Sequence, residues 1–156
     1  MSDTPIDKPR GPKVWADCHL EGDEVVIGLS GWRRSLSTRR PVRFPVTSVV
    51  RVTRDPMARA HVKIGFHQWR RHGGGLWRVG AYHGLDGWSL WSIGIGRNAV
   101  LFECRGAHFR YVVVEVADPD RTVQEVLAAK RRAAEHSVEE PREGSGQAGN
   151  RDAASS

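Results

Sequence analysis

Several kinds of residue are scarce in this 156-residue chain, and each scarcity excludes a class of protein. There are two cysteines, Cys18 and Cys104, which are too few for a disulfide-stapled scaffold or a cysteine-rich zinc site. Because each lies inside a predicted strand, we expect both to be small buried side chains. The chain has no run of about 18 apolar residues, so no membrane-spanning helix is predicted.

The start of the chain also lacks a feature. Residues 1–12 contain three prolines and no apolar segment, so they do not have the hydrophobic region of a secretory signal. We therefore expect a cytoplasmic protein. The length is that of one domain.

Motifs that carry chemistry are missing as well. Gly94-Ile95-Gly96 precedes a predicted strand instead of a helix, so it is no dinucleotide-binding fingerprint. His61, His67 and His72 are six and five residues apart, and these spacings match no standard zinc pattern. Acidic residues are sparse in the middle of the chain, which disfavours catalysis by paired carboxylates. The sequence predicts no enzyme, no metal and no cofactor.

The best-specified stretch, residues 78–133, is typical of four short strands followed by a helix. Asp86-Gly87 has the chemistry of a tight hairpin turn. In the last strand Val112, Val114 and Val116 share one face, while Phe109, Tyr111 and Val113 share the other. Apolar residues on both faces indicate a strand that is covered on both sides. The predicted strands are Val79–His83, Trp88–Ile93, Ala99–Arg105 and Phe109–Val116.

A helix is predicted directly after these strands. Asp118 is a good N-cap, and Pro119 occupies the first helical position, where proline is favoured. Val123, Val126 and Leu127 form a narrow apolar stripe, which we expect to cover one side of a sheet.

The first half of the chain is predicted to be strands too. Alternating apolar residues indicate strands at residues 13–20, 25–29, 42–44 and 49–53, with one helical turn starting at Pro45. Residues 57–77 fit either a short edge strand at 62–66 or a long loop, and Gly73-Gly74-Gly75 is predicted to be irregular. We expect one domain at 13–136, between a flexible lead at 1–12 and a disordered tail at 137–156.

The order of these motifs resembles bacterial pleckstrin-homology-like (PH-like) domains. More narrowly, it is similar to small, mostly uncharacterised PH-like proteins of high-GC bacteria. The resemblance rests on Gly80-Ala81-Tyr82, Gly87-Trp88, residues 100–106 and residues 111–119. It implies a mainly β fold with one C-terminal α-helix: a strongly bent antiparallel sheet, or partial barrel, that the helix caps. It implies no agreed ligand and transfers no functional residues.

The charge is unevenly distributed. The whole chain carries +6, but residues 31–78 hold eleven arginines and one lysine against Asp55 alone, a net charge of +11. Such a one-sided field attracts polyanions, and arginine suits forked contacts to phosphate or carboxylate. The alternative is that these arginines are scattered over a solvated surface. The candidate anion-binding residues are Arg33, Arg34, Arg39, Arg40, Arg70 and Arg71.

Trp69 and Trp77 flank a basic glycine-rich stretch. Tryptophan beside arginine can stack on bases or lie at a membrane interface, or it can simply pack under a loop. Our first hypothesis is a non-catalytic binding or scaffolding module whose partner is an acidic protein or an anionic membrane surface. The first alternative is a nucleic-acid-binding protein that uses residues 31–78. The second is a small enzyme or carrier with a pocket at the barrel mouth.

Overall fold

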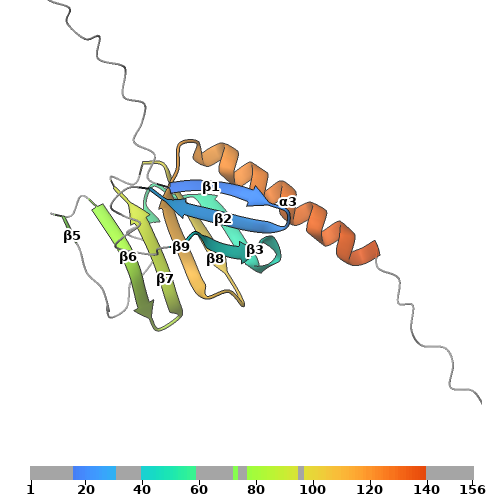
Figure 1. The fold of residues 1–156 in the computed structure, drawn as a ribbon, viewed down its shortest axis with the longest axis horizontal. Coiled ribbons are helices and arrows are strands. Elements are labelled where there is room, and N and C mark those ends of the chain that lie inside the picture. Colours follow the sequence, from blue (N-terminus) through green and yellow to red (C-terminus); the bar gives the residue numbers. More distant parts are fainter. Residues whose placement is uncertain (1–15, 31–39, 59–71, 74–76, 95–96, 140–156) are drawn as a thin grey trace, which may run out of the picture.

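The computed structural model of the protein describes residues 16–30, 40–58, 72–73, 77–94 and 97–139 (Figure 1). The predicted fold class is confirmed: the chain is mainly β, with a single C-terminal helix. Two sheets face each other without closing, and the helix lies against their open side, so the arrangement is a partial barrel capped by a helix.

The smaller sheet has the order β1-β2-β3. Strands β1 (Ala16–Glu21) and β2 (Glu24–Leu29) form a hairpin, and β3 (Val42–Pro45) pairs with the other side of β2; both pairings are antiparallel. Gly22 has φ of +60° in the hairpin turn, a conformation that glycine adopts without strain. The helical turn expected at Pro45 is confirmed as the 3₁₀ segment η1 (Val46–Ser48).

The larger sheet has the order β4-β8-β9-β7-β6-β5. Its shortest member, β5, includes Gly73, so the prediction that this glycine is irregular is wrong. The strands are β4 (Val49–Arg54), β5 (His72–Gly73), β6 (Trp77–Gly84), β7 (Gly87–Ile93), β8 (Ala99–Cys104) and β9 (Phe109–Glu115).

One pairing departs from an antiparallel meander. Strand β8 follows β7 in the chain but pairs with β4 and β9, and β7 lies parallel to β9. Leu90 to Ile93 of β7 and Val112 to Val114 of β9 are all buried. Parallel pairing suits strands that are covered on both faces, which explains why these two lie together at the centre of the sheet.

The core consists of two clusters, one on each face of the larger sheet. The first fills the space between the two sheets and the helix, and includes Ile27, Phe44 and Phe102. The second includes Tyr82, Trp91, Leu101 and Val113. The expectation that the last strand is covered on both sides is therefore confirmed.

One residue of that strand was assigned to the wrong face. Phe109 packs in the first cluster and not with Val113. The pairing register shifts between Trp88 and Ser89, so that Trp88 lies opposite Phe109 and Ser89 opposite Tyr111. This irregularity breaks the alternation on which the prediction rested.

Helix α3 (Pro119–Glu139) starts as predicted. A carboxylate oxygen of Asp118 accepts a hydrogen bond from the backbone N–H of Arg121 at 3.0 Å, which is the expected N-cap. The helix runs to Glu139, into the segment that was predicted to be a disordered tail, and the Ser137 hydroxyl donates to the carbonyl of Ala133 at 2.9 Å. The last three helical residues were thus wrongly placed in the tail.

The buried stripe of α3 differs from the predicted one. Val126 and Ala129 are 2% exposed, whereas Leu127 is 42% exposed. Residues 122, 126, 129 and 133 lie on one helical face at spacings of three and four, and this face covers the first cluster. Leu127 lies about 100° round the helix from Val126, toward solvent.

Cys104 is buried and Cys18 is partly buried, and neither forms a disulfide. Within the described residues, no helix is long and apolar enough to cross a membrane.

Candidate functional site

Most of the predicted site lies outside the residues that the structure describes. Trp77 begins β6, but its side chain belongs to the part that is not described. Arg40 is described and exposed, directly before β3. The predicted residues outside the description are Arg33, Arg34, Arg39, Trp69, Arg70 and Arg71.

Arg40 lines a cavity of about 270 Å³, which we call the β3 cavity. It lies between the start of β3 and the turn that leads from β8 into β9. Two buried rings, Phe44 and Phe109, contribute an apolar floor. The lining residues are Arg40, Pro41, Val42, Arg43, Phe44, Ala107, His108 and Phe109.

The two arginines of the β3 cavity differ in their partners. The Arg43 guanidinium donates to Glu21 at 2.6 Å and approaches Glu24 at 3.5 Å. The hydrogen bond to Glu21 raises the pKa of Arg43, and the same contact holds the pKa of Glu21 below its usual value. Arg40 has no ion pair with any described carboxylate. Among the described residues that line this cavity, Arg40 is therefore the guanidinium without an acidic partner.

A row of rings, here called the aromatic ladder, leads to the same cavity. His83 packs edge-on against Trp88 with centroids 5.0 Å apart, and Trp88 stacks on His108 at 6.2 Å. His108 in turn meets the edge of Phe109 at 4.7 Å. His108 was not among the predicted site residues, although its place two residues after the Gly106 turn was a signal for an exposed ring at a hairpin end.

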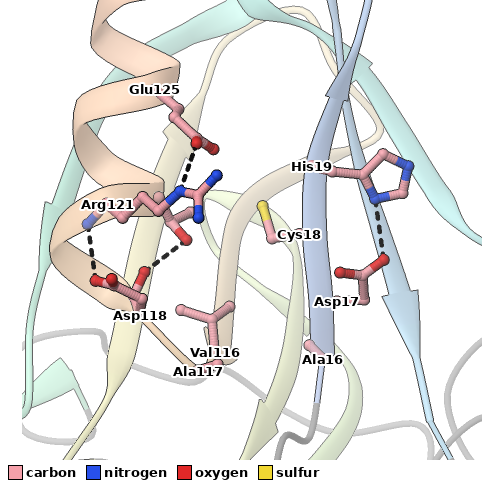
Figure 2. Close-up of a pocket in the computed structure, with 10 residues that line it drawn as sticks. Ala16, Asp17, Cys18, His19, Val116, Ala117, Asp118, Arg121 and Glu125 are labelled. Atoms are coloured by element: carbon pink, nitrogen blue, oxygen red, sulfur yellow. Dashed lines mark hydrogen bonds and ion pairs between the residues drawn. The ribbon is translucent and has the colours of Figure 1, made fainter.

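A second cavity of about 300 Å³, here called the β1 groove, lies between β1 and the start of α3 (Figure 2). The side chain of Cys18 points across it toward the helix. The lining residues are Ala16, Asp17, Cys18, His19, Val116, Ala117, Asp118, Arg121, Thr122 and Glu125.

Ion pairs line both walls of the β1 groove. On the helix, the Arg121 Nε–H donates to Glu125 at 2.7 Å. On the strand, His19 contacts Asp17 at 3.0 Å and Glu21 at 3.1 Å, and the hydrogen bond with Glu21 is the main cause that raises the pKa of His19. Three carboxylates and one guanidinium line the groove, so it carries net negative charge whether His19 is neutral or protonated.

The thiol in the β1 groove is not a nucleophile. Burial, with smaller contributions from Asp17 and Glu125, raises the pKa of Cys18 to about 12. Since the thiolate is the reactive form, this side chain behaves as an apolar one near neutral pH. Among the described residues, no group of three or more histidine, cysteine, aspartate or glutamate side chains could hold a metal ion.

Charged groups are also buried on the opposite face of the larger sheet. Asp55 and Glu115 are 7% and 8% exposed, and a Glu115 carboxylate oxygen accepts from the N–H of Gly94 at 2.6 Å. The Arg78 guanidinium lies 4.6 Å from the centre of the Trp91 ring. The hydrogen bond from Gly94 to Glu115 holds the residue that follows β7 against β9, so the role of Glu115 is structural.

Comparisons with known proteins give no family assignment. No protein-family model matches the chain, and no curated protein and no solved structure is significantly similar to it.

Proposed function

We propose that the protein is a non-catalytic binding module that holds an acidic segment of a protein partner in the β3 cavity. The observation that carries the proposal is the position of Arg40, an exposed guanidinium without a described acidic partner, at the edge of a cavity with an apolar floor. Arginine binds carboxylates through a planar, two-pronged arrangement of donors. The floor formed by Phe44 and Phe109 suits an apolar side chain next to the acid.

The surroundings of the cavity favour a discrete carboxylate over a continuous polyanion. Glu21 and Glu24 lie on the neighbouring strands and neutralise Arg43. A membrane surface or a nucleic-acid backbone would bring many negative charges near these glutamates, which would repel it. A single acidic side chain can reach Arg40 without meeting them.

One observation favours nucleic acid as a second candidate. Trp88 is half-buried between His83 and His108, so its ring belongs to a series of flat groups on which unpaired bases could stack.

We also propose that the chain is related to the PH-like proteins that its sequence resembles. The bent pair of sheets and the C-terminal helix support this relationship. The parallel pairing of β7 with β9 departs from the continuous meander that the resemblance implies.

Fluorescence anisotropy with a labelled peptide of alternating glutamate and leucine tests the function. We expect Arg40→Glu to weaken binding roughly tenfold, because an attractive charge pair becomes repulsive. Arg132→Glu is the matched control, since Arg132 is an exposed residue of α3 that does not line the cavity.

Equal binding by Arg40→Glu and the wild type would contradict the proposal. Vesicles that contain phosphatidylserine and a single-stranded oligonucleotide are tested in parallel. If either binds in an Arg40-dependent way while the peptide does not, the partner is a membrane or a nucleic acid, and the acidic-peptide assignment is wrong.

A further inference from the structure

The strand edges of this fold are not equally protected. An open edge presents unpaired N–H and C=O groups, which another strand can use as a template. The smaller sheet ends at β1 and β3, and the larger sheet ends at β4 and at the two-residue strand β5. The backbone contacts show which of the three longer edges can accept a strand.

The β3 edge is blocked by proline. The N–H of Val46 donates to the carbonyl of Asp23 at 2.8 Å, and this bond fixes the alternation along β3. Val42 and Phe44 therefore direct their backbone groups toward β2, and Pro41, Arg43 and Pro45 direct theirs outward. Two of these three outward residues have no N–H, so this edge cannot form a regular ladder.

The β4 edge is blocked by a bulge and by the helix. The register against β8 shifts between Val49 and Arg51, which leaves Val50 as an extra residue. The carbonyl of Val50 accepts a hydrogen bond from the Lys130 ammonium group at 3.2 Å. Arg54, at the other end of β4, pairs with Asp120 of α3 at 3.0 Å.

Within the described part of the chain, neither a proline, nor a bulge, nor a hydrogen bond from the helix occupies the β1 edge, although α3 also packs near this strand. The same alternation, carried across β2, directs the backbone groups of Asp17, His19 and Glu21 toward β2. The groups of Ala16, Cys18 and Leu20 point away from the sheet. No proline or register shift interrupts this strand, and no described residue bonds to these outward groups.

The β1 groove lies along this open edge. Ala16 to His19 form one wall, and the first turns of α3 form the other (Figure 2). Val116 and Cys18 supply apolar surface, and Asp17, Asp118 and Glu125 supply negative charge that Arg121 offsets only in part. The groove thus combines backbone groups that no described residue bonds with an acidic lining.

We propose that β1 binds an extended, basic segment of a partner protein, which adds a fourth strand to the smaller sheet within the β1 groove. The main-chain hydrogen bonds of Cys18 and Leu20 hold the segment. Asp17 on one side of β1 and Glu125 on the other favour lysine or arginine on either face of the added strand. This site is separate from the β3 cavity and has the opposite charge, so the proposal does not depend on the proposed function.

Self-pairing of the edge about His19 is disfavoured by charge, whereas pairing about Cys18 would place Asp17 opposite His19, so a second copy of the chain is an outcome that the experiment below must separate. Antiparallel pairing of β1 with itself about His19 would place Asp17 of one copy opposite Glu21 of the other. Like charges directly opposite one another destabilise a sheet. A basic segment in the same place meets carboxylates instead.

The decisive probe is a labelled peptide of about six residues that alternates lysine with valine. We expect it to bind, and we expect the amide protons of Cys18 and Leu20 to exchange at least about tenfold more slowly in the complex, as measured by NMR. The same peptide with an N-methyl group at every residue keeps its charge but has no backbone N–H to donate from either edge, so it cannot pair as a regular strand. Equal binding of the methylated peptide, or unchanged exchange at Cys18 and Leu20, would overturn the proposal.

Charge variants test the selectivity of the groove. We expect Asp17→Asn combined with Glu125→Gln to weaken the lysine–valine peptide roughly tenfold, because the lysines lose an attractive carboxylate on whichever face of the added strand they occupy. Asp86→Asn, in the β6–β7 turn, is the matched control and should bind as the wild type does. Equal binding of a glutamate–valine peptide would also overturn the proposal. So would slow amide exchange at Cys18 and Leu20 that appears without peptide as the protein concentration rises, because a second copy of the chain would then occupy the edge.

Discussion

Cys18 and Cys104 show how the environment of a residue sets its chemistry. Burial is the main cause that raises the pKa of both thiols, to about 12 for Cys18 and about 11 for Cys104, from a usual value of 9.0. A cysteine in a cavity suggests a nucleophile when only the residue type is considered. The surroundings of these two make them apolar contacts of the first cluster.

These pKa values predict how stability depends on pH. In the unfolded chain both thiols ionise near their usual pKa, whereas in the folded protein they stay neutral to higher pH. Stability from the neutral thiols is therefore fully present below pH 9.0 and is lost as the pH rises from there toward 11 and 12. Urea denaturation between pH 8 and pH 10 measures this loss, and the Cys18→Ala, Cys104→Ala variant should lose less stability over that range. An identical decline in both proteins would contradict the raised pKa values.

At the scale of elements, the sequence of α3 predicts where the helix starts but not which of its residues face the core. The cap residues and the start of the helix followed from local chemistry at Asp118 and Pro119. The choice between Val126 and Leu127 as the inward residue could not be made locally, because both fit an apolar stripe. The position of the helix against β4 and η1 decides it, and that position depends on the whole sheet.

Two substitutions in α3 test this assignment. Val126→Asp places a carboxylate in the first cluster and should cost about 3 kcal/mol or more, since a buried unpaired charge is among the most destabilising changes. Leu127→Asp, one residue away and 42% exposed, should change stability by less than about 1 kcal/mol. Thermal melts followed by circular dichroism compare the two. If Leu127→Asp is the more damaging variant, the helix packs through a different face.

At the scale of the molecule, the sequence specified strands better than it specified their partners. Turn chemistry such as Asp86-Gly87 and alternation such as Val100 and Phe102 are local, and both led to correct elements. The pairing of β7 with β9 joins residues that are distant in the chain, and no local pattern marks it. The site follows the same rule. Arg40 was identifiable as a candidate by charge, but the β3 cavity exists only because β3 meets the turn before β9.

Both sheets share the first cluster, so we expect the molecule to unfold as one unit. Phe44 of the smaller sheet meets the edge of Phe102 of the larger sheet, with ring centroids 5.7 Å apart. Phe44→Ala should cost about 3–5 kcal/mol, because it leaves a void between the sheets. The loss should weaken amide-exchange protection in β8 and β9 as much as in β2.

The exposed Val50 supplies the control, since Val50→Ala should leave both sheets protected. Protection that falls in β2 alone would mean that the smaller sheet opens independently of the larger one. The β1 edge would then also open without global unfolding, and amide exchange at Cys18 would report sheet opening instead of an unpaired edge. If amide-exchange protection falls equally in both sheets, the β1 groove and the β3 cavity are both held in place by the first cluster. Phe44 belongs to that cluster and also forms the floor of the β3 cavity.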